Sequence, residues 1–186
     1  MDFIIILFFL VTLLYLLILF FFIKELIYAL FIFKGAPFVP CPEDQIIKIL
    51  DLLELKPGEI LYDLGSGDGR VIIEAANSYG VKAIGIEINP LLVFSSRRRI
   101  IKLGLEGKVE VLWGNFFKKN LSGANAITVY LTQPANNRLE RKFLSELRPK
   151  TRVVSKSFTF KNLPFIKSDL ENPNLRLYQI PSDKNR

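Results

Sequence analysis

The stretch from Ile60 to Arg70 places the strongest constraint on how this chain can fold. It reads Ile60-Leu-Tyr-Asp-Leu-Gly-Ser-Gly-Asp-Gly-Arg70, in which an apolar run leads to an acidic residue and then to glycines at alternate positions. A turn at Lys56-Pro-Gly58 precedes it, and the apolar residues that follow have helical spacing. A buried strand is therefore predicted to enter a glycine loop that opens a helix, which is where open α/β sheets hold nucleotide-like ligands.

Strands are predicted to alternate with helices along the following residues, so the fold class is α/β with a doubly wound, mostly parallel sheet. A first helix is predicted from Pro42 to a point before Pro57, followed by helices at about 70–79, 90–103 and 134–147 and strands at about 59–64, 82–87, 108–113, 126–131 and 152–157. Two more apolar stretches, 165–170 and 175–180, flank the turn-rich Glu171-Asn-Pro-Asn174. They predict a hairpin of antiparallel edge strands, which makes the sheet a mixed, Rossmann-like one of the seven-strand type.

Residues 3–23 form an unbroken apolar run in which only one threonine and one tyrosine carry polar side-chain atoms. As a helix this run would be about 31 Å long, which matches the hydrocarbon core of a bilayer. No positive n-region precedes it and no Ala-x-Ala pattern follows it, so it is predicted to be a retained single-pass anchor in the membrane and not a signal peptide. Lys24 and Lys34 follow the span and no Lys or Arg precedes it, which predicts that the following domain faces the cytoplasm.

The anchor with its juxtamembrane helix is predicted to occupy residues 1–34. Residues 26–33 are expected to continue as a helix at the membrane interface until Gly35-Ala-Pro37 ends it. Residues 35–42 are rich in proline, which is typical of a rigid, extended linker. The folded domain is predicted to occupy residues 43–186.

The composition excludes several kinds of chemistry. Histidine is absent and Cys41 is the only cysteine, which removes Ser-His-Asp and Cys-His catalysis, histidine-ligated metals and an intramolecular disulfide, and no metal site is predicted. The formal net charge is +7, and it falls on residues 35–186 because the charges of residues 1–34 cancel. A basic domain indicates an anionic partner, either lipid head groups or nucleic acid, and a solvated surface that serves solubility explains the charge equally well.

The spacing of the glycine loop distinguishes between classes of ligand. Asp63-Leu-Gly-Ser-Gly-Asp-Gly69 has glycines spaced G-x-G-x-G, whereas the dinucleotide fingerprint is G-x-G-x-x-G and a P-loop ends in Gly-Lys-Ser/Thr. An acidic residue at the end of the strand fits a pyrophosphate poorly but suits an ammonium group. The predicted ligand is therefore nucleoside-like, cationic and free of phosphates, namely S-adenosylmethionine. The glycines let the backbone approach its carboxylate and sulfonium arm, and Asp63 can engage its amino end.

Two further polar residues follow the next two predicted strands. Glu87 ends the strand 82–87 and could accept hydrogen bonds from both ribose hydroxyls, and Asn115 follows the strand 108–113 and could read the adenine edge. A lone glycine loop, a surface carboxylate or a turn-capping asparagine would each be ordinary, but their succession at strand ends predicts a cofactor site. Its predicted members are Asp63, Gly65, Ser66, Gly67, Asp68, Gly69, Glu87, Asn115 and Phe116, the last offering an apolar face beside the adenine.

Over roughly residues 42–180 the chain resembles the class I, seven-strand, S-adenosylmethionine-dependent methyltransferases. A closer resemblance rests on the N-terminal apolar segment, Pro37-Phe-Val-Pro40, Asp63-Leu-Gly-Ser-Gly-Asp-Gly-Arg70, Glu87-Ile-Asn-Pro90 and Arg152-Val-Val-Ser155. These motifs resemble the family that contains the ATP synthase c-subunit and adenine nucleotide translocase lysine methyltransferases. The resemblance implies N-methylation of a lysine in a membrane-associated protein. The chain departs from the family's usual pattern at Cys41, where threonine is common, and at Asn115, where aspartate is common.

Class I enzymes place their acceptor-side residues at the end of the fourth strand, which here reads Tyr130-Leu-Thr-Gln-Pro134. The resemblance therefore makes Tyr130, Thr132 and Gln133 the candidates for orienting the acceptor amine, with Phe38 and Pro40 of the linker at the substrate entrance. No residue is identified as a general base.

Two other functions stay open at this stage. A nucleic-acid methyltransferase would account for the charge, but adenine-N6 enzymes carry an Asn/Asp-Pro-Pro-aromatic motif where this chain has Leu131-Thr-Gln-Pro-Ala135, and a membrane span makes nucleic acid an unlikely substrate. A non-catalytic, cofactor-binding membrane protein is the other alternative. Arg97-Arg98-Arg99 is predicted to be a solvated helix surface, since consecutive residues step about 100° around the axis, with lipid head-group contact as the second interpretation.

Overall fold

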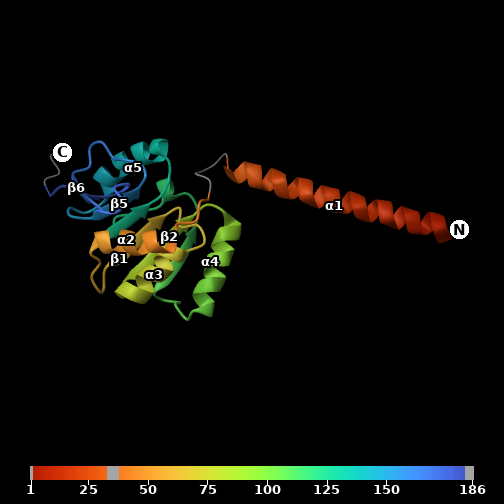
Figure 1. The fold of residues 1–186 in the computed structure, drawn as a ribbon, viewed down its shortest axis with the longest axis horizontal. Coiled ribbons are helices and arrows are strands. Elements are labelled where there is room, and N and C mark those ends of the chain that lie inside the picture. Colours follow the sequence, from red (N-terminus) through yellow and green to blue (C-terminus); the bar gives the residue numbers. More distant parts are fainter. Residues whose placement is uncertain (1, 33–37, 183–186) are drawn as a thin grey trace. The chain divides into compact units, whose positions relative to one another are not determined.

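The computed structural model describes residues 2–32 and 38–182, which belong to two compact units, Met1–Pro37 and Phe38–Arg186. The first unit contains the helix α1, Asp2–Ile32 (Figure 1). Among the described residues, Phe3–Leu26 is the one helical segment long and apolar enough to cross a membrane, with a mean hydropathy of 3.2. The helix continues unbroken into the expected interfacial segment, and its predicted end at Gly35-Ala-Pro37 lies outside the described residues.

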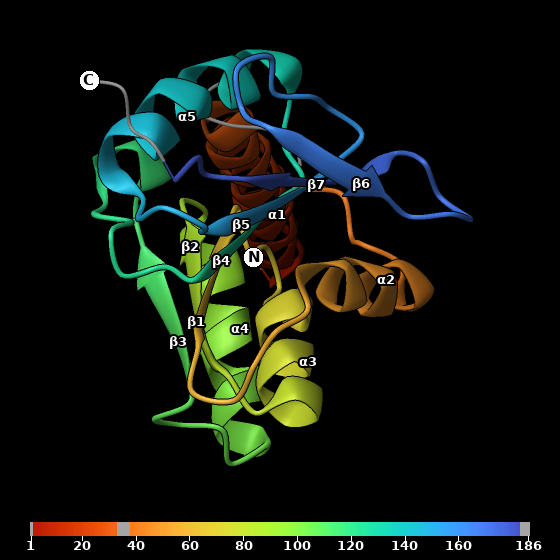
Figure 2. The ribbon, with the colours of Figure 1, turned by 90° about the vertical axis from the view of Figure 1, so that its left-hand side faces the viewer.

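The second unit is built on a seven-stranded sheet in the order β3-β2-β1-β4-β5-β7-β6 (Figures 1 and 2). Neighbouring strands from β3 to β5 are parallel, and β7 runs antiparallel to both β5 and β6. The prediction of an α/β fold with a mixed, seven-stranded sheet is confirmed. The strands are β1 (Ile60–Leu64), β2 (Lys82–Glu87), β3 (Val109–Trp113), β4 (Ala126–Val129), β5 (Arg152–Lys156), β6 (Phe165–Ser168) and β7 (Leu175–Gln179).

The predicted C-terminal hairpin forms at one end of the sheet, where β6 and β7 pair antiparallel to each other and β7 pairs antiparallel to β5. β7 inserts between β5 and β6, so β6 forms the edge and runs in the same direction as β5. Leu175, Leu177 and Tyr178 of β7 are buried, whereas Phe165 and Ile166 of β6 are about half exposed. The hydrophobic pattern predicts both strands, but which of them enters the sheet depends on tertiary packing, in which β7 contacts β5 and α2.

Helices cover both faces of this sheet (Figure 2). α2 (Glu43–Leu53), α3 (Arg70–Tyr79) and α4 (Pro90–Lys102) lie on one face, and α5 (Gln133–Glu146) lies on the other. Leu50, Ile72 and Val93 contribute one buried side chain from each of the first three helices to a continuous apolar core. Because both faces are covered, the central strands carry apolar side chains on both sides, as a buried parallel sheet requires.

Local signals in the sequence place most helix ends correctly. Gly69 and Gly80 flank α3 with φ angles of +81° and +65°, and the side chain of Asn89 accepts a hydrogen bond from the first turn of α4. Several predicted boundaries shift by one or two residues. Pro42 caps α2 instead of being its first residue, and β4 ends at Val129, two residues early, because the chain turns there toward α5.

Candidate cofactor and acceptor site

The glycine loop, residues 65–69, is fixed to the end of β2 by backbone hydrogen bonds. The N–H groups of Gly65 and Ser66 both donate to the carbonyl of Ile86, at 2.8 and 3.3 Å, and the Gly69 N–H donates to the Ser66 carbonyl at 2.9 Å. Gly65, Gly67 and Gly69 have φ angles of +84°, +55° and +81°, in the left-handed region that favours glycine. The alternate glycines are therefore needed for the shape of the loop itself, besides leaving room for a ligand.

The side chain of Ser66 lies beneath the loop, against β2. Its hydroxyl is buried and has no hydrogen-bond partner within the described part of the chain. A Cβ atom at Gly85 would come within 2.5 Å of Ser66 Oγ and 2.8 Å of Ile72 Cδ1. The predicted contact between Ser66 and the cofactor thus depends on the backbone of this residue and not on its hydroxyl.

Asp63 stands at the centre of the sheet and is only 7% exposed. It lies between Gly85 of β2 and Thr128 of β4, and its Oδ1 accepts a hydrogen bond from Thr128 Oγ1 at 2.8 Å. Burial raises the pKa of the Asp63 carboxyl to about 7, with the charges of Glu87 and Asp68 acting in the same direction and the Thr128 hydrogen bond opposing them. Across residues 2–32 and 38–182, no lysine or arginine forms an ion pair with Asp63. A cationic group on a ligand would complement this carboxylate.

Glu87 connects the end of β2 to the glycine loop. It is 7% exposed, and its two carboxylate oxygens accept hydrogen bonds from the backbone N–H groups of Gly67, at 2.9 Å, and Asn89, at 2.8 Å. These two donors fix the orientation of the carboxylate without using all its lone pairs. Glu87 is therefore held rigidly at the position predicted for the ribose, with acceptor capacity left for hydroxyl groups.

Asn115 lies at the same edge of the sheet as Glu87, because Glu87 pairs with Trp113 and the Gly114 N–H donates to the Glu87 carbonyl at 2.9 Å. Its Oδ1 accepts from the Phe117 N–H at 2.9 Å, which caps the short 3-10 helix η1, Phe116–Lys118. The turn-capping role considered for this residue is thus present. The predicted contacts of Asn115 and Phe116 with an adenine stay predictions.

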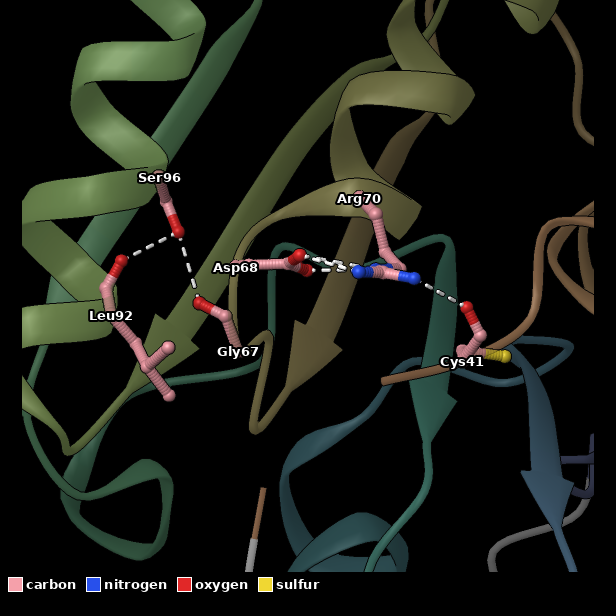
Figure 3. A network of polar contacts seen from close by, with 6 residues as sticks. All are labelled: Cys41, Gly67, Asp68, Arg70, Leu92 and Ser96. Carbon is pink, nitrogen blue, oxygen red and sulfur yellow. Dashed lines mark hydrogen bonds and ion pairs between the residues drawn. The ribbon is translucent and has the colours of Figure 1, made fainter. Parts of the chain in front are cut away.

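A polar network holds the glycine loop from two sides (Figure 3). The Arg70 guanidinium forms an ion pair with Asp68 at 2.7 Å, and its Nη1 donates to the Cys41 carbonyl at 2.9 Å. Burial alone would raise the pKa of Asp68, but the guanidinium lowers it below the usual value. From the α4 side, Ser96 Oγ donates to the Gly67 carbonyl at 2.9 Å. Asp68 therefore orients Arg70, which ties the linker to the loop. The predicted contact of Asp68 with the cofactor stays a prediction.

The acceptor side of the site is formed where β4 and β5 end. Val129 pairs with Ser155, so the next residues, Tyr130 and Lys156, lie side by side. Lys156 is only 8% exposed, and its Nζ lies 4.1 Å from the centroid of the Tyr130 ring and 3.7 Å from Cys41 Sγ. Among the described residues no carboxylate forms an ion pair with Lys156. The fold thus places a buried lysine without a carboxylate partner beside Tyr130, one of the acceptor-side candidates.

The other two acceptor-side candidates bond within the fold. Thr132 caps α5, and its Oγ1 accepts from the backbone of the first turn at 3.4 Å. Gln133 Nε2 donates to Asn137 Oδ1 at 2.8 Å and to the Thr159 carbonyl at 2.9 Å. Through these contacts Thr132 and Gln133 hold α5 and the chain after β5 in place. The acceptor-side roles of Tyr130, Thr132 and Gln133 stay predictions.

The predicted entrance residues border the glycine loop. A Cβ atom at Gly67 would overlap the ring of Phe38, so this ring lies directly over the loop while remaining 45% exposed. Pro40 is exposed one step further along the linker. Their role at a substrate entrance stays a prediction.

Sequence reasoning missed four side chains that shape the site, namely Arg70, Ser96, Thr128 and Lys156. Thr128 carries a signal that could have found it, since it is the one polar residue of β4. Lys156 carries a weaker one, because Arg152 and Ser155 are also polar residues of β5. Arg70 and Ser96 carry no such signal for their contacts with Cys41 and Gly67, because these partners are each 29 residues away along the chain.

The family of the chain follows from its sequence relatives. The profile described as the ANTKMT methyltransferase domain matches residues 63–167, from the buried aspartate to β6. The chain belongs to this methyltransferase family. The predictions of the family and of an S-adenosylmethionine-dependent methyltransferase are confirmed, and the matched residues include the whole glycine loop, Glu87, Asn115 and Tyr130.

Individual relatives agree with the family match. The chain is 41% identical over 123 residues to a protein-lysine N-methyltransferase of Saccharolobus islandicus (strain REY15A), covering 66% of this chain and 76% of that protein. It is 34% identical over 124 residues to the ATP synthase c-subunit lysine N-methyltransferase of Homo sapiens, covering 67% and 52%, and 35% identical over 123 residues to the adenine nucleotide translocase lysine N-methyltransferase of Mus musculus, covering 66% and 53%. The matches thus span about half the length of these two animal relatives.

Solved structures give the same fold. A structure of an RNA methyltransferase from Salinibacter ruber with S-adenosyl-L-homocysteine superposes with a TM-score of 0.72 at 35% identity, covering 78% of this chain and 95% of that one. A geranyl diphosphate methyltransferase bound to S-adenosylmethionine shares the fold at 22% identity with a TM-score of 0.55, over 60% of this chain and 47% of that one.

Proposed function

We propose that this protein transfers a methyl group from S-adenosylmethionine to a lysine side chain of a protein held at a membrane. The observation that carries the proposal is the buried Asp63 carboxylate, which has no cationic partner among the described residues and adjoins the glycine loop of a methyltransferase family domain. Lysine is the proposed acceptor because the relatives described above are named for lysine methylation.

Each part of the cofactor has a proposed partner among the residues of this chain. Asp63 is proposed to pair with the amino group, and the glycine loop is proposed to hold the methionine arm. Glu87, which keeps free lone pairs, is proposed to bind the ribose hydroxyls. Asn115 and Phe116 are proposed to border the adenine. When bound, S-adenosylmethionine supplies a methyl group made electrophilic by its sulfonium.

The acceptor side must supply a neutral amine in line with that methyl group. A lysine amine has a reference pKa of about 10.4, so it needs an environment that favours loss of a proton. The buried cation of Lys156 over the Tyr130 ring disfavours a second positive charge nearby. As the bond from the acceptor nitrogen to the methyl carbon forms and the carbon–sulfur bond breaks, Tyr130 is proposed to orient the amine, and the proton leaves to water. Positioning accounts for most of the acceleration in such a displacement.

Isotope transfer tests this function. We would incubate the full chain with methyl-labelled S-adenosylmethionine and separated membrane-protein, soluble-protein and RNA fractions, and then identify methylated lysine in protein hydrolysates. Label should appear on lysine in the membrane fraction. Asp63→Asn should lose most of it, and Glu106→Gln, a change at an exposed carboxylate in the turn after the C-terminal end of α4, should retain it.

A second candidate function has one specific observation in its favour. The Salinibacter ruber structure, at 35% identity, is described as an RNA methyltransferase, and the domain is basic. Against this stands Leu131-Thr-Gln-Pro-Ala135, which lacks the Asn/Asp-Pro-Pro-aromatic motif of adenine-N6 enzymes. Label confined to the RNA fraction would replace the first proposal with this one, and cofactor binding without any label would point to a non-catalytic protein.

We further propose that α1 crosses the membrane once and that the domain faces the cytoplasm, since Lys24 and Lys34 follow the span. Cysteine accessibility tests the orientation. In intact cells a membrane-impermeant maleimide should label Asp2→Cys, and it should label Asn77→Cys in α3 only after the membrane has been permeabilised. The reverse pattern would contradict the orientation.

A further inference from the structure

Helix α4 presents an exposed face that combines apolar and basic side chains. Leu91, Phe94 and Ile101 are 69%, 62% and 61% exposed, and Arg98 and Lys102 are exposed among them. At about 100° per residue these five positions fall within one face of the helix, which we call the α4 face. Helix α4 contains no acidic residue, so the charge of the face is wholly positive.

The fold holds this face outward. The residues buried on the opposite side of α4 are Val93, Ser96 and Ile100. Of the three consecutive arginines, Arg97 belongs to the fold, because its Nη2 donates to the Val111 carbonyl at 2.7 Å. Arg98 instead lies over the Phe94 ring, 5.8 Å from its centroid. The sequence predicts that the three arginines form a solvated surface. In the structure Arg97 instead bonds to β3, whereas Arg98 belongs to the amphipathic α4 face.

We propose that the α4 face lies on the head-group region of an anionic lipid bilayer. Helices with basic residues beside leucine and phenylalanine bind there, with the apolar side chains at the acyl boundary and the cationic ends at the lipid phosphates. An RNA would match the charge but leave Leu91, Phe94 and Ile101 in water. An apolar protein groove would cover those side chains but bury Arg98 and Lys102 without partners.

The short connection between α1 and the domain also favours a lipid bilayer as the partner of the α4 face. This argument rests on the proposed membrane span of α1. Residues 33–37 separate α1 from Phe38, and a fully extended chain covers at most about 20 Å between them. Phe38 lies over Gly67, whose carbonyl accepts a hydrogen bond from Ser96 on the buried side of α4. A chain that crosses the bilayer through α1 therefore keeps α4 within reach of the bilayer surface.

Docking of this face would also orient the cofactor site. Helix α4 begins at Pro90, and the Glu87 carboxylate accepts from the N–H of its capping residue, Asn89. The bilayer would thus lie close to the ribose end of the site, and a lysine emerging from the membrane would need to travel only a short distance.

Depth-dependent quenching in the full chain tests the proposal. A bimane label is attached to one introduced cysteine at a time. Ser95→Cys lies beside the α4 face, Asn77→Cys on α3 is an exposed control, and Leu14→Cys lies within α1. The native Cys41 is buried. The chain is reconstituted in phosphatidylcholine vesicles with brominated acyl chains, with or without phosphatidylglycerol. In anionic vesicles the label at Ser95 should be quenched about twofold more than the label at Asn77. This difference between the two labels should be smaller in neutral vesicles or in 1 M salt.

Substitutions on the α4 face provide the second arm. Arg98→Glu with Lys102→Glu should lower the quenching at Ser95 to the Asn77 level, and Arg148→Glu, an exposed charge elsewhere, should leave it unchanged. Equal quenching at Ser95 and Asn77 in anionic vesicles would overturn the proposal, as would a response at Ser95 that requires added RNA or protein. Absent quenching at Leu14 would instead refute the span, which keeps the two failures distinguishable.

Discussion

At the scale of single residues, the site depends on a carboxylate that the fold keeps out of water. Asp63 is 7% exposed, and burial raises its pKa to about 7. A protonated Asp63 carries no charge and cannot attract an ammonium group. The protonation state of this one side chain therefore decides how firmly the amino end of the cofactor is held.

We expect the affinity for S-adenosylmethionine to depend on pH through Asp63. Below a pKa of about 7, binding the ammonium group must first remove a proton from the carboxyl, so Kd should rise about tenfold for each pH unit below 7 and level off above it. Calorimetry from pH 5.5 to 8 measures this. Asp63→Asn should bind weakly and without this dependence, and a wild-type Kd that is constant over the range would contradict the expectation.

Lys156 should influence the acceptor amine. Its buried cation beside Tyr130 disfavours a protonated lysine nearby, so Lys156→Met should move the rising limb of the pH–kcat profile up by about one pH unit. Lys156→Arg keeps the charge and should leave the limb near its original position. An unchanged profile in Lys156→Met, with normal cofactor binding, would show that this charge does not act on the acceptor.

At the scale of elements, the glycine loop and β2 form one packed unit. The loop donates two N–H groups to the Ile86 carbonyl, and Ser66 fills the space above Gly85. β2 cannot move away, since it is paired on both sides with β1 and β3. A side chain introduced into β2 must therefore displace the loop.

Gly85→Ala should weaken both stability and cofactor binding for this reason. Its Cβ would lie 2.5 Å from Ser66 Oγ and 2.8 Å from Ile72 Cδ1, which predicts a loss of about 1–3 kcal/mol in the free energy of unfolding. Gly123→Ala is the matched control, since its nearest neighbour would be 3.6 Å away, and it should cost less than about 0.5 kcal/mol. Denaturant unfolding and calorimetry measure the two effects, and similar behaviour of both variants would contradict this packing.

At the scale of the whole molecule, the residues of the site described above all belong to the second unit, Phe38–Arg186. The buried core of that unit is formed by residues from Cys41 onward. The cofactor site and the proposed anchor are thus separable, one supplying the chemistry and the other the location.

A shortened chain of residues 38–186 should therefore bind S-adenosylmethionine with an affinity within about threefold of that of the full chain. Its methyl transfer to membrane proteins should fall about tenfold or more, because the anchor confines enzyme and substrate to one surface and raises their effective concentration. Calorimetry and the labelling assay measure the two quantities. Undiminished labelling of the membrane fraction would show that α1 does not deliver the domain to its substrate.

Local sequence determined much of the fold. The glycines at 69 and 80 take positive φ angles and delimit α3 at the predicted residues, and β2 spans the predicted Lys82–Glu87. Asp63 and Glu87 belong to the neighbouring strands β1 and β2. They lie at the same edge of the sheet because parallel strands bring their carboxyl ends to one edge. The grouping of Asp63, the glycine loop and Glu87 was predictable, since each lies at or just after the carboxyl end of a strand with a clear local pattern.

Tertiary structure alone decided the rest. Lys156 reaches Cys41 across 115 residues of sequence, and Arg70 joins the loop to the linker. The insertion of β7 between β5 and β6 and the pKa of Asp63 depend in the same way on segments that meet only in the folded chain. Caps, turns and periodicity are properties of neighbouring residues and can be read from the sequence, whereas burial and charge at a point depend on every segment that packs around it.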